Sequence, residues 1–261
     1  MVVIWTLAAG GVAGFVLGFL GAGGTIVGLP FLFFLARLSP HHALGTNALG
    51  VSLIAAALLA WRLWHGEVPL REGIAFTLPG LGGILLGAHL GLLYPGRKLI
   101  FLLGILIFVV SGWMFYLSTR QPSTRDDPAA DPIPRQPRPF SKSSLLKIIP
   151  TAFAVGATAG FFAIGGGFMI VPGLMLAAGL DLGLAATSAL LPISAFAALV
   201  GIDYFLAGSV NVRLSLLMLV AGLAGGGYGI WLSKRVAKKT MLRAFGIFLA
   251  LLGLYMLHPP I

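Results

Sequence analysis

The sequence predicts an all-α polytopic membrane protein made of two inverted-topology repeats, each with a broken helical hairpin followed by three transmembrane helices. Composition is the first reason. Of the 261 residues, 58% are hydrophobic and only 9% are charged, whereas an average soluble chain carries about 25% charge. A mean hydropathy of +1.01 agrees. So few charges cannot cover the surface of a soluble protein. The other two reasons are an internal repeat and the lengths of its apolar segments.

The repeat becomes visible when the sequence is shifted by 142 residues, because glycines and other residues then align in the same order along both halves. The matched pairs include Gly14 with Gly156, Gly18 with Gly160, Phe19 with Phe161, Pro30 with Pro172, Gly66 with Gly208, Gly80 with Gly222, Gly83 with Gly225, Gly87 with Gly229 and Gly104 with Gly246. One match between glycines is weak, but the ordered series indicates an internal duplication.

The repeats are predicted to span residues 1–118 and 145–261, with a linker at 119–144. Six of the 16 prolines fall between Arg120 and Lys142. This stretch has no apolar periodicity and little to bury, which is typical of a flexible extramembrane segment.

Each repeat contains five apolar segments. They are 2–20, 25–38, 45–64, 73–94 and 99–117 in the first repeat, and 146–163, 168–180, 184–206, 214–232 and 241–257 in the second. About 20 residues cross a bilayer. The second segment is short and follows a glycine cluster, so the first two predict a hairpin that crosses twice or re-enters.

Either form of hairpin returns to its starting side, which leaves each repeat with an odd number of passes. An odd repeat must be inverted relative to its partner, as in many secondary transporters. Most of the 17 Lys and Arg residues then fall on the side of the linker. The positive-inside rule therefore predicts a cytoplasmic linker and both termini outside.

Two glycine-rich breaks are the first candidate site. They are Gly21-Ala22-Gly23-Gly24-Thr25 and its counterpart Gly165-Gly166-Gly167. A helix that starts just after such a break presents free N–H groups at the positive end of its dipole, which favours an anion. We expect Gly23, Gly24, Thr25, Gly165, Gly166 and Gly167 to bind the substrate. The alternative is that these glycines only permit close helix packing.

Polar pairs near the start of the third segment of each repeat are the second candidate. They are Thr46-Asn47 and Thr187-Ser188, and each pair is expected to open its helix. Thr, Asn and Ser are also the usual N-cap residues, so capping is an equally good explanation. The two roles are compatible, because both use hydroxyls and free N–H groups.

Isolated ionisable residues within the apolar segments are candidates for coupling or gating. They are His89, Asp203 and Arg62. An ionisable residue inside a membrane is a functional hypothesis by default, with H⁺ or Na⁺ as the coupling ion. Near a segment end, however, such a side chain can reach the polar interface instead.

Several classes of function are excluded or disfavoured. The net charge of +10 lies in connections rather than on a polar helix, which argues against nucleic-acid binding. No cysteine is present. His41-His42 is expected in a connection without a carboxylate beside it, so we expect no metal site. Glu67 and Glu72 are expected in a connection as well. No hydrolase or Walker motif occurs, which predicts a protein that is not an enzyme and has no cofactor.

These motifs resemble the TauE/SafE family of sulfite and organosulfonate transporters. The family repeats a G-x-G-G-G stretch, a proline and a G-T-S-like step in both halves. Here these are Gly21 to Thr25 with Pro30 and Gly45-Thr46-Asn47, then Gly165 to Gly167 with Pro172 and Ala186-Thr187-Ser188. Thr25, Asn47 and Ala186 depart from the family pattern.

The resemblance implies transport of a small sulfur-containing anion, such as sulfite or an organosulfonate, by alternating access across a prokaryotic inner membrane. Its partners would be that anion, the lipid bilayer and a coupling ion. A passive anion channel is the main alternative, and a membrane-embedded enzyme acting on a lipid-linked substrate is a more distant one.

Overall fold

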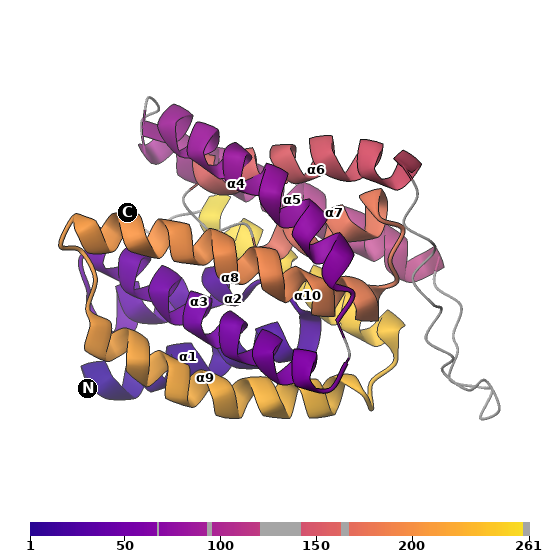
Figure 1. Ribbon diagram of the computed structural model, residues 1–261. Helices are drawn as coiled ribbons and strands as arrows, with labels where there is room; N and C mark the ends of the chain where they lie inside the picture. Colours follow the sequence, from indigo (N-terminus) through magenta and orange to yellow (C-terminus); the bar gives the residue numbers. More distant parts are fainter. Residues whose placement is uncertain (67, 93–95, 121–141, 163–166, 258–261) are drawn as a thin grey trace.

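The computed structural model describes residues 1–66, 68–92, 96–120, 142–162 and 167–257, and within these ranges the chain is helical without any strand (Figure 1). The first half contains α1 Val2–Leu20, α2 Gly24–Pro30, the π-helical turn η1 Phe31–Leu35, α3 Pro40–Trp64, α4 Leu70–Leu92 and α5 Gly96–Arg120. The second half contains α6 Lys142–Phe161, α7 Gly167–Ala177, α8 Leu182–Leu206, α9 Val212–Ser233 and α10 Lys238–Leu257.

The predicted all-α fold and its apolar segments are confirmed. Five helices of the described residues are long and apolar enough to cross a membrane, namely Val2–Leu20, Pro40–Trp64, Leu70–Leu90, Leu182–Leu206 and Val212–Ser233. The ends of α5 and α6 extend into the predicted linker, and residues 121–141 lie outside the described part. The short second segment is confirmed too, since α2 runs into η1 and ends at Leu35.

The two halves exchange helices with each other. The first helix of each half packs on the fourth helix of the other, so that α1 lies against α9 and α6 lies against α4. In Figure 1 these two pairs lie along opposite edges of the bundle. A methyl group on Gly14 would overlap the backbone of Gly222, and one on Gly156 would overlap the backbone of Gly80. A shift of 142 residues turns Gly14 into Gly156 and Gly80 into Gly222. Each contact is therefore the counterpart of the other, as expected for a two-fold arrangement of the halves.

The paired helices run in the same direction. Along α1, Gly10 lies against Met218, Gly14 against Gly222 and Gly18 against Gly226. The residue numbers of the contacts increase along both helices, so α1 and α9 are parallel. Small residues let the two backbones come this close, as is common for helices packed in membranes.

The remaining pairs, α3 with α8 and α5 with α10, join equivalent helices of the two halves. Ser52 Oγ donates to the carbonyl oxygen of Ser194 at 3.1 Å, where α3 crosses α8. Ser111 Oγ donates to the carbonyl oxygen of Gly246 at 2.8 Å, between α5 and α10.

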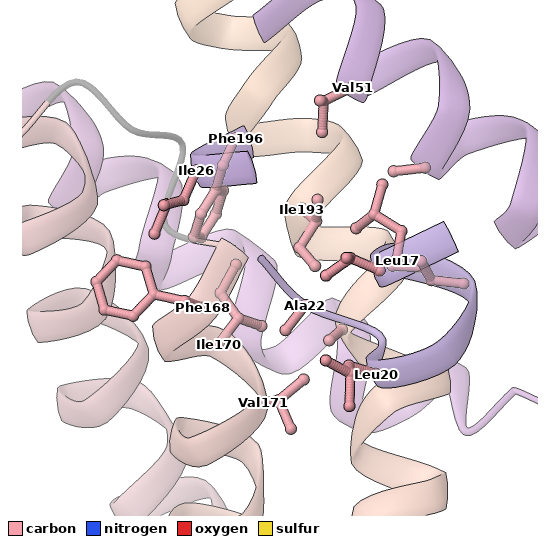
Figure 2. Packing of buried hydrophobic residues seen from close by; sticks show 14 of the residues in the cluster. Leu17, Leu20, Ala22, Ile26, Val51, Phe168, Ile170, Val171, Ile193 and Phe196 are labelled. Atoms are coloured by element: carbon pink, nitrogen blue, oxygen red, sulfur yellow. The ribbon is translucent and has the colours of Figure 1, made fainter. Parts of the chain in front are cut away.

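The core is built where α2 and α7 meet α3 and α8. Figure 2 shows Leu17, Leu20, Ala22 and Ile26 from α1–α2 beside side chains of α7 and α8. Fully buried members of this cluster include Leu17, Ala22, Val51, Ile170, Ile193 and Phe196. The first break and the start of α7 are therefore packed inside the bundle, which is where irregular backbone is tolerated in a membrane protein.

Candidate functional site

The first break is made by two glycines with positive φ. Gly21 has φ 70° and its N–H donates to the carbonyl oxygen of Leu17 at 2.9 Å, which ends α1. Gly23 has φ 88° and precedes α2. Residues with a side chain rarely adopt this conformation. Gly21 also touches α8, because a methyl group there would overlap Ala186. The chain therefore turns sharply while it remains buried.

The start of α2 exposes backbone donors to this turn. The N–H groups of Ile26 and Val27 both donate to the carbonyl oxygen of Gly23, each at 3.2 Å. The N–H groups of Gly24 and Thr25 precede the first helical hydrogen bond and have no acceptor within the helix. Gly24 packs on α1, where a methyl group would lie 2.6 Å from Leu17 Cγ.

Gly167, the last residue of the second break, lies next to the first break. A methyl group on Gly167 would lie 3.4 Å from the amide nitrogen of Gly23 and 3.4 Å from Thr25 Oγ1. Gly167 is also the residue that the shift of 142 assigns to Thr25. The helix starts of α2 and α7 therefore meet at this point. Gly165 and Gly166 lie outside the described residues.

Thr25 and Asn47 each carry a buried polar atom at this meeting point. Both side chains are 4% exposed. Asn47 Nδ2 donates to the carbonyl oxygen of Thr25 at 2.7 Å, which ties α3 to α2. Thr25 Oγ1 and Asn47 Oδ1 are buried and find no hydrogen-bond partner among the described residues. A buried polar atom without a partner is costly, so it indicates a site that a ligand completes.

The other predicted hydroxyls are used in the structure itself. Thr46 Oγ1 accepts from the backbone N–H of Asn211 at 3.0 Å. Ser188 Oγ donates to the carbonyl oxygen of Pro69 at 3.2 Å. Each bond joins one repeat to the segment before the fourth helix of the other repeat. Thr187 Oγ1 donates to the carbonyl oxygen of Leu184 at 2.9 Å, one turn earlier in α8. The roles of Pro69 and Asn211 were not predicted from the sequence, because no motif marks a residue that contributes only a backbone group.

The expectation that these polar pairs open their helices is wrong. α3 begins at Pro40 with Ser39 as N-cap, and α8 begins after Asp181, whose carboxylate accepts from the N–H of Leu184 at 3.0 Å. Proline favours the first helical position, and α3 starts five residues before its predicted segment, whereas α8 starts two residues before its own. Thr46, Asn47, Thr187 and Ser188 are interior residues, and capping does not explain them.

Two further predictions, which placed residues in connections, are wrong because the helices begin before their apolar patterns do. His41 and His42 are exposed residues in the first turn of α3 rather than in a connection. Glu72 lies in the first turn of α4 and is 6% exposed. A carboxylate near a helix N-terminus is stabilised by the helix dipole. An acidic residue just before an apolar run can therefore belong to the helix itself rather than to the connection before it. Glu67 lies outside the described residues.

The three candidates for coupling or gating do not come together. Arg62 is buried at 8% exposure, and its Nη2 lies 3.4 Å from the carbonyl oxygen of Gly18 in the last turn of α1. Asp203 is exposed near the end of α8, and His89 is exposed near the end of α4. α3 and α8 run antiparallel, since Gly45 lies against Tyr204 and Gly201 against Leu49. Arg62 and Asp203 are therefore at opposite ends of this pair.

The Asn47 side chain should be essential for the order of the first break. In an Asn47→Asp variant, a carboxylate oxygen would replace the amide donor against the carbonyl oxygen of Thr25. We expect a loss of about 1–3 kcal/mol of stability, since two buried acceptors would face each other. Thermal unfolding of the purified protein measures it.

The matched control is Asn211→Asp. Asn211 Oδ1 caps α9 by accepting from the N–H of Leu214 at 3.2 Å, and a carboxylate caps a helix equally well. Equal unfolding temperatures for the two variants would contradict the role assigned to Asn47.

Comparison with known proteins identifies relatives along the whole chain. A profile of the family described as "Sulfite exporter TauE/SafE" matches residues 6–256. Two proteins named "Probable membrane transporter protein", from Xylella fastidiosa strains Temecula1 and 9a5c, are each 34% identical over 257 residues, covering 97% of this chain and 94% of their own length. "Probable membrane transporter protein YunE" of Bacillus subtilis is 24% identical over 264 residues, covering 95% and 94%. No solved structure matches the chain.

Proposed function

This chain belongs to the sulfite exporter TauE/SafE family, and on that premise we propose that it is a secondary transporter for a small sulfur-containing anion. Its relatives are named as membrane transporters, and it is an integral membrane protein with several apolar helices of membrane length. Sulfite follows the family description, and an organosulfonate is the related substrate that the motif resemblance implies.

The observation that carries the proposed site is the hydroxyl of Thr25, which has no hydrogen-bond partner in the part of the chain that the structure describes. It is buried at the point where α2 and α7 begin, beside the amide nitrogen of Gly23. A hydroxyl and free backbone N–H groups are donors, and donors without acceptors in a buried place favour an anion. We assign the anion to Gly23, Gly24, Thr25 and Gly167. Asn47 is assigned to hold Thr25 in position, and Gly165 and Gly166 remain predicted contributors from the second break.

The inverted topology and alternating access remain part of the proposal, and the direction of helix packing supports the inverted topology. If each hairpin returns to its starting side, the first and fourth helices of one repeat are antiparallel. The first helix of one repeat then runs parallel to the fourth of the other only when the repeats are inverted. α1 and α9 are parallel, as the successive contacts of Gly10, Gly14 and Gly18 require.

The membrane orientation is proposed from charge alone. The linker would be cytoplasmic and both termini would lie outside. The prokaryotic inner membrane is proposed from the family resemblance instead. Coupling to H⁺ or Na⁺ is part of the same proposal. Arg62 is the most buried of the three candidates for gating, because it rests on the end of α1 next to the first break.

Uptake of radiolabelled sulfite into liposomes tests the transport proposal. We expect uptake that saturates with sulfite concentration and that falls when unlabelled organosulfonates compete. Empty liposomes are the control. Uptake that rises linearly without saturation would identify a channel instead of a carrier. Uptake no greater than that of empty liposomes, from protein with a sharp size-exclusion peak, would remove sulfite as the substrate.

A further inference from the structure

Glu72 is a buried acidic residue that the candidate anion site does not use. It lies in the first turn of α4 and is 6% exposed. The buried face of this helix continues from Glu72 to Phe76 and Gly80, at intervals of four residues. Phe76 is fully buried and lies against Gly173 of α7. Gly80 lies against Phe196 of α8. Glu72 therefore belongs to the inner side of α4 rather than to the surface of the bundle.

The carboxylate of Glu72 forms no hydrogen bond and no ion pair with another residue in the described part of the chain. Its oxygens keep a small accessible surface, because they are not among the fully enclosed polar atoms that lack a partner. A carboxylate that loses water without gaining a partner can lose its charge by binding a proton. Glu72 is therefore a group that a proton can reach and neutralise.

The start of α4 does not by itself explain why Glu72 is buried. In a capping box, a glutamate at the third helical position accepts from the backbone N–H of the N-cap residue. The residue before α4 is Pro69, which has no N–H to donate. The dipole of α4 favours an acidic side chain in the first turn whether it is exposed or buried. Neither effect requires this side chain to lose its hydration.

The second repeat fills the equivalent position without a charge. A shift of 142 residues assigns Leu214 to Glu72. Leu214 lies in the first turn of α9 and is also 6% exposed. The packing of the fold therefore accepts a leucine at this position and does not depend on a carboxylate. Because an ionisable residue among membrane helices is costly, its presence in one repeat indicates a function.

The charged groups that surround Glu72 come from α4 itself and from the helices packed on it. α4 packs on α6 and α8, and the sequence of α7 contains no titratable residue. The titratable and charged residues of α4, α6 and α8 besides Glu72 are Arg71, His89, Lys142, Lys147, Asp181 and Asp203. None of the described side chains of this set forms an ion pair with Glu72. An ion pair with them therefore does not hold the carboxylate in its charged form.

We propose that Glu72 couples transport to protons, because it binds a proton in one arrangement of the repeats and releases it in another. This inference rests on the proposed function, since it names the group through which an H⁺ gradient would drive the anion. The neutral side chain suits the buried, unpaired position of Glu72, whereas the charged side chain needs water or a cation. A proton that binds one arrangement better than the other shifts the balance between them.

The proton and the anion cross the membrane in the same direction in this scheme. A proton from the water on one side binds to a carboxylate oxygen of Glu72, and the same O–H bond breaks when the proton leaves on the other side. A positive charge that moves with a negative one reduces the net charge passing through the apolar bundle, which lowers the cost of the step. A pH gradient that is acidic outside should therefore raise the accumulation of the anion inside liposomes.

Uptake of radiolabelled sulfite by the full chain in liposomes tests this role, with the uptake of protein-free liposomes subtracted. The wild type should accumulate more sulfite when the lumen is more alkaline than the outside than when both have the same pH. Glu72→Gln keeps the shape of the side chain but cannot bind and release a proton, so it should accumulate equal amounts in both conditions. It should still exchange unlabelled sulfite inside for labelled sulfite outside, which shows that the variant folds and binds the anion.

The matched control is Asp181→Asn. The carboxylate of Asp181 caps α8 by accepting from the N–H of Leu184, and asparagine caps a helix equally well. This variant should keep the response to the pH gradient. An undiminished response in Glu72→Gln, an equal loss in Asp181→Asn, or a wild type that exchanges sulfite but ignores the gradient would each overturn the proposal.

Infrared difference spectroscopy separates the role of Glu72 from the identity of the anion. Lowering the pH of the wild-type protein in lipid should produce a carboxylic-acid C=O band that Glu72→Gln lacks and that Asp181→Asn retains. If the wild type exchanges no sulfite, sulfite is not the substrate, and this band then decides on Glu72 by itself. Identical difference spectra for the wild type and Glu72→Gln would show that Glu72 binds no proton, which overturns the proposal whatever the transport result.

Discussion

Replacing Thr25 by valine should raise the KM for the transported anion about 10- to 100-fold, the range expected for losing one hydrogen bond to a charged group. Valine keeps the branched shape of threonine and removes only Oγ1. That oxygen has no partner among the described residues, so its removal breaks no hydrogen bond to any of them. The carbonyl oxygen of Thr25, which accepts from Asn47, is retained. The unfolding temperature should therefore stay the same or rise slightly, while concentration-dependent uptake into liposomes reports the loss of affinity.

Two variants decide whether the hydroxyl itself is responsible. Thr25→Ser restores the donor and should recover most of the affinity. Thr187→Val removes a hydroxyl that already bonds to the carbonyl oxygens of Gly183 and Leu184 in its own helix, so transport should be unchanged. Normal KM in Thr25→Val, or an equal defect in Thr187→Val, would show that the anion does not bind this hydroxyl.

Much of the fold could be predicted from composition and from the internal repeat. The apolar runs locate the helices, because a membrane helix must be apolar over about 20 residues. The helix starts were less accurate. Pro40 and Glu72 belong to first turns and Asp181 is an N-cap, and these positions favour proline and polar or acidic residues. An apolar pattern therefore begins later than the helix that contains it.

The residues of the candidate site could be predicted only in part. The glycines of the first break follow from the sequence, because few other residues allow such a turn. The difference between Thr25 and Thr46 does not. Both are buried threonines near a glycine, but Thr46 is bonded to Asn211, which lies 165 residues further along the chain. Which hydroxyl remains available depends on contacts between repeats, and a single sequence gives no measure of those contacts.

The exchange of helices between the repeats leads to the second large effect, which concerns stability. A methyl group on Gly225 would overlap the carbonyl oxygen of Gly11 where α9 meets α1. The equivalent residue Gly83 would overlap the carbonyl oxygen of Phe153 where α4 meets α6. Backbone atoms cannot move aside as a flexible side chain can. Gly225→Ala and Gly83→Ala should each cost about 1–3 kcal/mol through overpacking.

Gly227→Ala is the matched control, since no atom lies within 4 Å of a methyl group at this position of the same helix. Alanine favours a helix by up to about 1 kcal/mol over glycine, so this variant should be as stable as the wild type or more stable. Thermal unfolding in detergent measures all three variants. Equal midpoints for Gly225→Ala and Gly227→Ala would contradict the close approach of α9 to α1. A defect in Gly225→Ala without one in Gly83→Ala would contradict the reciprocity itself. That reciprocity also brings Thr25 next to Gly167, so the stability of these variants tests the arrangement on which the anion site depends.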